Sequence, residues 1–533
     1  MHTGPFDVLI RGAMVFDGAG NPWFLGDVGL KGERIAAVAP AGLLKPEGAR
    51  EVVEAAGLAV CPGFIDIQSH SITTLMNDGR CVSKLTQGVT TEIMGETWVP
   101  APHGGKCGPL PAAWREKAKG WTRFRHWFDA LLEAGVSPNV GSFFAAGTLR
   151  SLACGMRMGA PAPDELERMK TLLDEAMADG AFGISYALIY PPDCYVETAE
   201  IVEIAKVAAR RGGLYITHMR SESDRLLEGV EEALEIGRRA GLPVEIYHLK
   251  AAGKANWPKM AQAIARIDAA RAEGQDVTAC MYPYVASGTG LSTQVPAWAA
   301  ADDLLFKNVA DPQVRPKLRA EMLGRFAGAN ELGARAEGIM PVGFRLPEHR
   351  GYIGKRLSQI AAERGQEWVD AVLDLLASEG HDIFTIFFSM SERNLQLQLR
   401  QPWIKVASDA GGTDPARAGG LVHPRGYGTF TRVLGHYARD LGVLSFEEAV
   451  RKMSGAVAAR LGLADRGILR AGAWADVVLF DPKTVADRAT FEEPHRLSVG
   501  VQDVWVNGTK VVSNGEHTGA KPGKFVAGPG AEA

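Results

Sequence analysis

Residues 213–250 read GLYITHMRSESDRLLEGVEEALEIGRRAGLPVEIYHLK and predict one complete strand–helix–strand unit. The apolar runs at 213–219 and 243–250 predict buried strands. Between them, over residues 223–240, apolar side chains recur at helical spacing: Leu226, Leu227, Val230, Ala233, Leu234 and Ile236. Each strand ends close to a histidine, His218 in the first and His248 in the second. The unit therefore predicts two parallel strands whose carboxyl ends carry imidazole groups.

The same alternation of apolar strands and amphipathic helices occupies residues 58–462. We predict eight strands, at 58–70, 90–96, 140–148, 180–190, 213–219, 243–250, 276–284 and 404–410. Eight is the number at which a parallel sheet closes, so the predicted fold class is an α/β protein with a (β/α)₈ barrel of the TIM type. The long gap before the last strand predicts an inserted subdomain at about 288–400, hanging over the carboxyl ends of the strands.

The two ends of the chain have a different texture from the middle. Residues 1–57 and 463–533 both read as short strands separated by turns. Two unrelated β extensions would each have too few strands to be stable alone, so we predict one composite β-sandwich domain built from both ends. The Gly-, Ala- and Pro-rich tail after about residue 515 is expected to lack regular structure.

Composition sets limits on partners and location. The chain is 46% hydrophobic and 23% charged with a net charge of −4, which is typical of a globular protein and gives no reason to expect nucleic acid or a membrane as a partner. Six cysteines without a C-x-x-C pair predict reduced thiols. With neither a signal peptide nor a long apolar run, we expect a soluble, cytoplasmic protein. The oligomeric state is left open, a homo-oligomer included.

Four side chains mark a candidate metal site. His70, His218, His248 and Asp409 fall at the ends of predicted strands one, five, six and eight. In this fold the carboxyl ends of the strands form the floor of the active site. A single histidine there could equally be a buried structural residue. Several imidazoles with a carboxylate, however, form a donor set suited to zinc or another divalent metal.

Several motifs carry a resemblance to a known family. They are PGFIDIQSH (62–70), QGVTT (87–91), YITHMRSE (215–222), YHLKAAGKANW (247–257), YPYVAS (282–287), ASDAGG (407–412), HPRGYGTFTRVLG (423–435) and AARLGLADRGILRAGAWADVVLFDP (458–482). In order and over nearly the whole chain, they resemble the N-acyl-D-amino-acid deacylase (D-aminoacylase) group of the amidohydrolase superfamily. The resemblance implies metal-dependent hydrolysis of a linear amide, with an N-acyl-D-amino acid or a related N-acylated carboxylate as the small-molecule substrate.

Two positions depart from the family pattern. Gln68 stands where the family's first strand has the first histidine of a His-x-His pair, and an amide oxygen is a much weaker zinc ligand than an imidazole. Thr97 stands on the position of the family's metal-binding cysteine. Many members of the superfamily use a carboxylated lysine on the fourth strand as the anionic metal ligand, but the predicted fourth strand here contains no lysine. Glu96 is therefore the best available anionic ligand, although a structural ion pair at the barrel rim is the alternative.

These departures change the expected metal content. We expect one well-occupied Zn²⁺ site formed by Glu96, His218 and His248. A second site near His70 and Asp409 is expected to be weak or absent.

The resemblance also assigns roles around the metal. Asp409 would take a proton from water and return it to the leaving nitrogen. We expect six side chains to bind the substrate: Lys250, Tyr190, Tyr282, Tyr284, Thr289 and Arg425. His423 is expected to support them from behind. For the rings of Tyr190 and Tyr284, packing at the barrel rim is the alternative. Trp98 and Trp257 would line an acyl pocket or simply pack.

Two other functions remain open at this point. A cyclic-amide hydrolase of the dihydroorotase or hydantoinase kind would share the barrel and the metal, but the missing lysine and the long insertion weigh against it. A catalytically dead barrel kept for binding is the other alternative. Retention of Asp409 beside His218 and His248 weighs against that reading.

Overall fold

The computed structural model describes residues 6–103, 108, 110–325 and 336–532. Within these ranges, eight strand positions form the barrel: β6 (Phe64–Asp66), β7 (Val89–Met94), β8 (Asn139–Ser142) continued by β9 (Phe144–Ala145), β10 (Gly183–Ala187), β11 (Leu214–His218), β12 (Val244–Ile246), β13 (Val277–Met281) and β17 (Ile404–Val406). All their pairings are parallel. The predicted (β/α)₈ fold class is confirmed.

The barrel closes between its first and last strands. Ser69 and Ala410 form a parallel bridge, and the Asp409 N–H donates to the Gln68 carbonyl over 2.9 Å. This seam brings the chain after β6 next to the chain after β17. It therefore places His70 beside Asp409 although they are far apart in the sequence.

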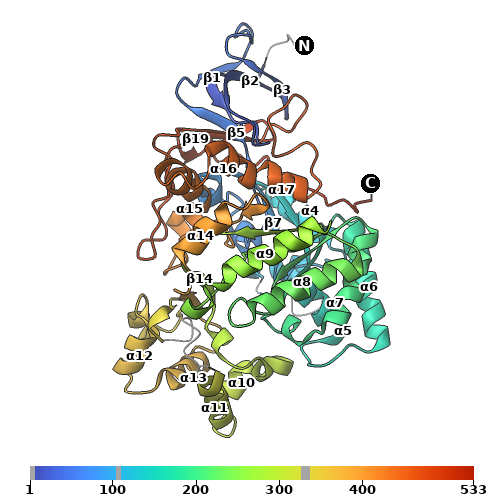
Figure 1. Ribbon diagram of the computed structural model, residues 1–533, viewed down its shortest axis with the longest axis vertical. Helices are drawn as coiled ribbons and strands as arrows, with labels where there is room; N and C mark the ends of the chain where they lie inside the picture. Colours follow the sequence, from blue (N-terminus) through green and yellow to red (C-terminus); the bar gives the residue numbers. More distant parts are fainter. Residues whose placement is uncertain (1–5, 104–107, 109, 326–335, 533) are drawn as a thin grey trace.

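Helices cover the outside of the barrel between the strands (Figure 1). The series α6 (Pro163–Ala178), α7 (Thr198–Arg210), α8 (Leu226–Ala240) and α9 (Lys259–Ala272) packs side by side in chain order. Helix α8 buries the apolar stripe that the sequence predicts, with Leu227 half-buried. It ends at Gly241, whose φ of 70° is the left-handed conformation that glycine adopts at low cost. The barrel interior below the site is filled by apolar side chains, including Ile65, Ile93 and Ile216.

The predicted first strand differs from the observed structure. Residues 58–70 are divided at Gly63 between β5 (Ala59–Pro62), which belongs to the terminal sheet, and β6, which begins the barrel. A continuous apolar run cannot show this division, because both halves are buried. The third predicted strand is also shorter, since helix α5 (Ala146–Cys154) begins at Ala146.

Both ends of the chain contribute to one sheet. Among the described residues it has nine strands: β1 (Val8–Val15), β2 (Phe24–Lys31), β3 (Arg34–Pro40), β4 (Glu51–Glu54), β5, β18 (Val477–Phe480), β19 (Val501–Val506), β20 (Thr509–Ser513) and β21 (Glu516–His517). The two ends meet where β5 pairs antiparallel with β18. The boundaries 1–57 and 463–533 for a separate sandwich domain stay a prediction.

The tail after residue 515 is more ordered than its composition suggests. Beyond β21 it forms no helix within the described residues, yet it runs along the barrel. The Val526 N–H donates to the Val140 carbonyl, and the Gly528 N–H donates to the Gly180 carbonyl, both over 2.8 Å. The Phe525 ring packs on Phe128 with centroids 4.6 Å apart. Backbone hydrogen bonds to the strand starts, which composition cannot reveal, fix the path of the tail.

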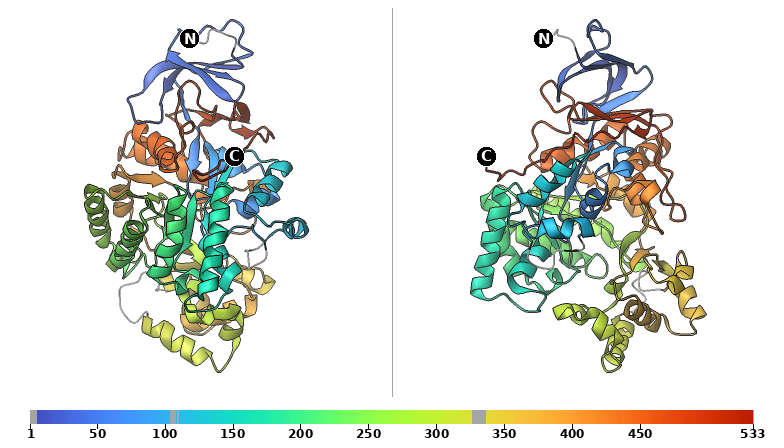
Figure 2. Two further views of the ribbon diagram at one scale, coloured as in Figure 1. Left: turned by 90° about the vertical axis from the view of Figure 1, so that its right-hand side faces the viewer. Right: turned by 180° about the vertical axis from the view of Figure 1, so that it is seen from behind.

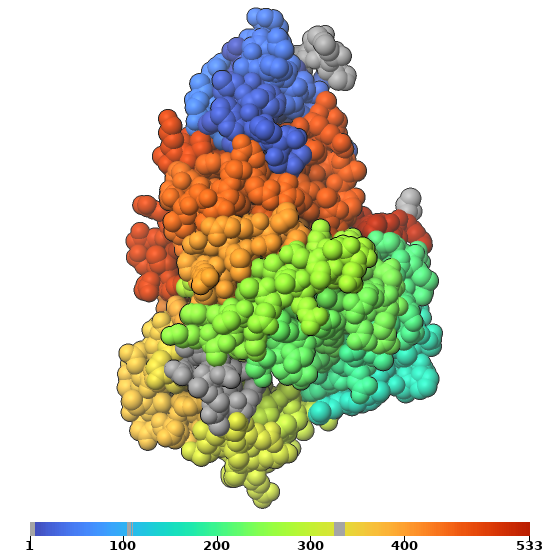
Figure 3. Space-filling model, viewed as in Figure 1, coloured from blue at the N-terminus to red at the C-terminus, as the bar shows by residue number. Residues whose placement is uncertain are grey.

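An insertion lies between β13 and β17. It contains β14 (Ser287–Gly290), α10 (Leu305–Ala310), α11 (Arg315–Arg325), β15 (Ile339–Pro341), α12 (Leu357–Glu363), α13 (Trp368–Glu379) and β16 (Phe384–Phe387). These elements surround a hydrophobic core of their own. Figures 1 and 2 show the insertion and strands β1–β3 at opposite ends of the molecule. In Figure 3 the insertion, coloured yellow to olive, lies against the green part of the barrel.

Free thiols and the lengths of the helices complete the description of the residues that the structure covers. The cysteines in the described ranges are free thiols: Cys61, Cys81, Cys154, Cys194 and Cys280. Cys107 lies outside the described residues. None of the described helices has the length and apolarity needed to cross a bilayer.

Candidate functional site

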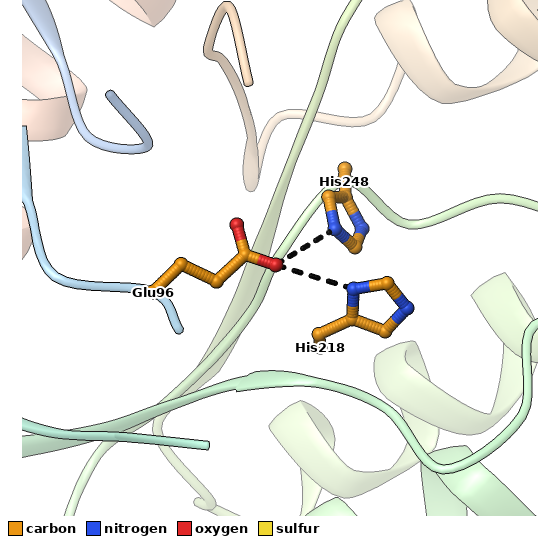
Figure 4. A group of neighbouring side chains, drawn as sticks. All are labelled: Glu96, His218 and His248. Carbon is orange, nitrogen blue, oxygen red and sulfur yellow. Dashed lines mark hydrogen bonds and ion pairs between the residues drawn. The ribbon is translucent and has the colours of Figure 1, made fainter. Parts of the chain in front are cut away.

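Three buried side chains converge at the carboxyl ends of the strands (Figure 4). Glu96 follows β7, His218 ends β11, and His248 follows β12. One carboxylate oxygen of Glu96, Oε1, lies 3.2 Å from His218 Nδ1 and 3.4 Å from His248 Nε2. Two imidazole nitrogens and one carboxylate oxygen therefore point at a common centre.

The dimensions of this cluster fit a metal ion. The three potential ligand atoms lie within 4.8 Å of one another. In a tetrahedral zinc site with ligands at about 2.0–2.1 Å, neighbouring ligand atoms are about 3.3 Å apart. The contacts of 3.2 and 3.4 Å match that spacing. Two imidazoles and a carboxylate are also the donor types that zinc prefers, so the residues present fit the ion.

A second cluster shares Glu96 with the first. His70 Nε2 lies 2.8 Å from Asp409 Oδ1 and 3.1 Å from Glu96 Oε2. The carboxylate oxygens of this second cluster already have other partners. Gln68 Nε2 donates to Glu96 Oε2 over 2.6 Å, and Arg425 Nη1 lies 2.8 Å from Asp409 Oδ2. A second cation here would face a guanidinium group and would have to compete with an amide donor.

Two of these side chains stand on strained backbone. His248 has a φ of 32° and Asp409 a φ of 53°, values that residues other than glycine seldom adopt. Such conformations concentrate at active sites, where the surrounding structure compensates the strain. They turn the chain sharply just after β12 and β17. The turns position the two side chains above the barrel.

The carboxylates of the site are held in their charged forms. Burial would raise the pKa of Glu96, but its contacts with His218, His248 and His70 hold that pKa well below the usual range. Burial opposes protonation of His70, whereas hydrogen bonds to Asp409 and Glu96 raise its pKa to about 10. Burial also raises the pKa of Asp409, and the Arg425 guanidinium more than offsets this, so the pKa is lowered. The centre strongly favours bound positive charge.

Glu222 is a site residue that sequence reasoning missed. Its Oε1 lies 2.9 Å from His248 Nδ1 and 2.6 Å from Lys250 Nζ, and its Oε2 lies 3.3 Å from His218 Nε2. It follows His218 by four residues in HMRSE, on the loop after β11. A carboxylate so close after a candidate ligand on the active face was the signal available in the sequence.

A cavity of about 590 Å³ opens above the cluster formed by Glu96, His218 and His248. Most of the side chains predicted to bind substrate line it: Lys250, Tyr190, Tyr282, Thr289, Arg425 and His423. Tyr284, predicted with them, is not among the lining residues. Its buried ring packs edge-on against His423, with centroids 5.4 Å apart. The chain turns after β13 instead of staying extended, since the Tyr284 N–H donates to the Tyr282 carbonyl over 3.0 Å. This turn puts the two rings into different surroundings, which the motif alone could not show.

The two predicted tryptophans also lie outside this cavity's lining. The Trp257 indole N–H donates to the Ser389 carbonyl over 2.8 Å, which ties the loop after β12 to the insertion. Trp98 borders a small separate pocket beside His70. Neither residue forms the wall of an acyl pocket above the cluster.

Two buried cations line the cavity. Arg425 contacts Asp409, donates through Nη2 to the Gly288 carbonyl over 3.2 Å, and lies over the Tyr282 ring at 4.6 Å. Lys250 is paired with Glu222. Buried guanidinium and ammonium groups suit a carboxylate ligand, which could accept several charge-assisted hydrogen bonds.

His423 supports Arg425 from outside the cluster of Glu96, His218 and His248. Burial and the neighbouring Arg425 charge lower the pKa of His423 well below its usual value, so the ring is neutral. Its Nδ1 accepts the Arg425 backbone N–H over 3.1 Å, and its Nε2 therefore donates to the Ala286 carbonyl over 2.9 Å. The ring fixes the start of α15 (Arg425–Arg432) against the chain after β13.

Tyr190 and Thr289 connect the barrel to the insertion. The Tyr190 hydroxyl lies 2.5 Å from Thr289 Oγ1. Burial raises the pKa of Tyr190, which keeps the hydroxyl protonated. Both residues also line a neighbouring cavity of about 970 Å³ between the insertion and the barrel loops. The site is therefore bounded on one side by the insertion.

Comparisons with known proteins agree with this geometry. The model of the amidohydrolase family matches residues 399–512. A D-aminoacylase from Alcaligenes xylosoxydans xylosoxydans is 36% identical over 526 residues, 98% of this chain and 98% of that protein. A solved D-aminoacylase, described as having a binuclear metal centre with one-metal activation and second-metal attenuation, has a TM-score of 0.80 at 34% identity, covering 98% of this chain and all of the other.

Two further structures place the chain within the family. An N-acyl-D-glutamate deacylase from Bordetella bronchiseptica, complexed with zinc and a phosphonate inhibitor, has a TM-score of 0.80 at 32% identity, covering 98% of this chain and all of the other. A dihydropyrimidinase from Brevibacillus agri has a TM-score of 0.57 at 15% identity over 98% of this chain and 99% of the other, which shows a shared fold alone. With more than a third of its residues identical to a D-aminoacylase over nearly its whole length, the chain belongs to the D-aminoacylase branch of the amidohydrolase family.

Proposed function

We propose that this protein is a metal-dependent hydrolase that removes the acyl group from an N-acyl-D-amino acid or a related N-acylated carboxylate. The observation that carries the proposal is the convergence of Glu96, His218 and His248 beside Asp409, in a cavity that also contains the buried cations Arg425 and Lys250. The first group suits a metal, and the second suits a carboxylate.

In this proposal one zinc ion would be held by Glu96, His218 and His248. When bound, zinc supplies Lewis-acid polarisation of the amide carbonyl and makes water more acidic. A second ion at His70 and Asp409 would be weak, because Gln68 and Arg425 already contact the oxygens it needs. The related D-aminoacylase with one-metal activation supports the sufficiency of a single ion.

Asp409 would act as the general base and then as the general acid. Its lowered pKa keeps it ionised and able to accept a proton from the attacking water. The same carboxyl group would then return that proton to the amide nitrogen as the C–N bond breaks, leaving a carboxylate and a free amine. The contact of 2.8 Å with His70 Nε2 holds one oxygen of Asp409 in a fixed position during this exchange.

Arg425 and Lys250 would bind the carboxylate of the substrate and thereby orient the amide above the cluster. Tyr190, Thr289 and Tyr282 supply neutral hydroxyl groups on the cavity wall. Strand β10 reads GISYA and has no lysine that could become a carboxylated metal bridge. This favours a linear amide as the substrate over the cyclic amides opened by dihydroorotases and hydantoinases. The intact cluster disfavours a catalytically dead barrel.

A substrate panel tests the proposal. Purified protein loaded with zinc should hydrolyse N-acetyl-D-amino acids faster than the N-acetyl-L forms, and should not open hydantoin or dihydrouracil rings. Metal analysis should find about one zinc per chain after dialysis. Ring opening without deacylation would overturn the choice of substrate. A preparation that retains no metal and has no activity would support the dead barrel.

A further inference from the structure

Two carboxylates enclose the two ligand histidines. Glu96 faces His218 Nδ1 and His248 Nε2, as Figure 4 shows. Glu222 faces the opposite nitrogens, His218 Nε2 at 3.3 Å and His248 Nδ1 at 2.9 Å. Each imidazole ring therefore lies between a carboxylate on the metal side and a carboxylate on the far side.

This arrangement has a consequence for the position of the ring protons. A neutral imidazole has one N–H and one lone pair, and only the lone pair can bind a metal. A carboxylate on the far nitrogen draws the N–H to that side and leaves the lone pair facing the metal. From a loop rather than from a strand, Glu222 lies within ion-pair distance of the far nitrogen of both rings, although its contact with His218 Nε2 lacks hydrogen-bond geometry.

Lys250 competes for one of these nitrogens. Its Nζ lies 2.7 Å from His248 Nδ1 and 2.6 Å from Glu222 Oε1. An ammonium group can only donate, so its contact with His248 Nδ1 favours the tautomer with the proton on Nε2, the wrong side for a metal. The Glu222 contact favours the opposite tautomer. The two neighbours of His248 therefore act in opposite directions on metal binding.

We propose that Glu222 is a positioning residue, which fixes the orientation and the tautomer of both His218 and His248 so that they bind zinc. The inference rests on the proposed metal site and adds to it a residue that touches neither the metal nor the reacting atoms. Glu222 acts through the two histidines, and its ion pair with Lys250 offsets its buried negative charge.

The alternative is a purely structural role, in which Glu222 only neutralises Lys250 and stabilises the loop after β11. The two roles separate in matched variants. Glu222→Gln removes the carboxylate, whereas Lys250→Met removes the cation and breaks the same ion pair. Glu232→Gln is a third variant, since Glu232 on α8 is paired with Arg220 and its side chain is as exposed as that of Glu222, 13% in both cases.

The experiment measures zinc affinity by competition with a chromophoric chelator, using the full-length protein in each case. Glu222→Gln should weaken zinc binding by about 10- to 100-fold, the usual effect of losing a hydrogen-bond partner of a ligand histidine. Lys250→Met should stay within about threefold of the wild type or bind more tightly. Glu232→Gln should leave the affinity unchanged. The visible spectrum of cobalt-substituted Glu222→Gln should also shift, since that spectrum reports the ligand geometry.

Each contrary result has a defined meaning. Wild-type zinc affinity in Glu222→Gln would overturn the inference while leaving the proposed function intact. Equal weakening in Glu222→Gln and Lys250→Met would overturn it too, because the ion pair alone would then explain the effect. A wild-type protein that binds no zinc would overturn the proposed function with it. If Glu222→Gln does not fold, as judged by circular dichroism, Glu222→Asp decides: it keeps the charge but shortens the reach, and unchanged affinity would overturn the proposal.

Discussion

Arg425 Nη1 lies 2.8 Å from Asp409 Oδ2, so the cation proposed to bind the substrate touches the carboxylate proposed to move the proton. The two functions of the cavity are therefore electrostatically linked. A substrate carboxylate that engages Arg425 shares the positive charge that otherwise acts on Asp409 alone. This contact also explains why a metal ion beside Asp409 would meet repulsion.

Replacing Asp409 by asparagine should abolish proton transfer while keeping the volume of the side chain. We expect kcat for an N-acetyl-D-amino acid to fall by about 10²- to 10⁴-fold, the usual contribution of a general base. Zinc content should remain near that of the wild type, because Glu96, His218 and His248 are unchanged. Steady-state kinetics with metal analysis checks both expectations. A kcat near the wild-type value would exclude Asp409 as the base.

Replacing Arg425 by methionine should affect substrates according to their charge. Loss of a charge-assisted hydrogen bond of about 1.5–3 kcal/mol should raise KM by roughly 10- to 100-fold for N-acyl amino acids. An N-acylamine without the carboxylate should show no such increase. Arg432→Met is a suitable control, since Arg432 pairs with Asp487 and does not line the catalytic cavity. A similar KM change for both substrate types would contradict a carboxylate-binding role.

Changing Gln68 to histidine should restore a second metal site. The new imidazole would stand beside His70 and Asp409 and would remove the amide that donates to Glu96 Oε2. We expect the zinc content after dialysis to rise from about one to about two ions per chain. Gln68→Glu, which adds charge but no imidazole, is a useful companion variant. No increase in either variant would mean that Arg425, rather than Gln68, prevents the second ion from binding.

Stability should depend on pH through Asp193, which lies three residues beyond Tyr190. Burial raises the pKa of its carboxyl group to about 7, against the lowering effects of the Ala187 N–H and Arg150. Between its ordinary pKa and 7 the folded state holds the proton that the unfolded state has lost, so this contribution to stability is full at low pH and is lost as pH rises through 7.

Asp193→Asn cannot ionise and should lack this loss. The Tm of the wild type minus the Tm of the variant should therefore fall between pH 5 and pH 8. Thermal melts of both proteins across that range, with the same metal loading, make the comparison. A constant difference in Tm would show that Asp193 does not titrate in this window.

Periodicity and strand ends predict the barrel and four residues of the site, whereas Glu96 and the residues lining the cavity were expected from the family resemblance. Apolar strands alternate with helices such as α8, and in this fold the ends of parallel strands must meet, which brings His70, His218, His248 and Asp409 together. What the sequence could not predict depends on turns and side-chain directions. The division of residues 58–70 at Gly63, the burial of Tyr284 behind His423, and the reach of Glu222 back to two histidines all arise from contacts between segments distant in sequence.

The pairing of β5 with β18 has a consequence for synthesis on the ribosome. Ala59 pairs with Phe480, so the N-terminal strands emerge long before the partner that completes their sheet. Until then the inner edge of β5 is an unpaired strand edge, the kind of surface that other chains can join. The β18-facing edge of β5 therefore stays unpaired, and open to chaperones, until almost the whole polypeptide has been translated. A premature stop anywhere in the barrel would release a chain with that edge open.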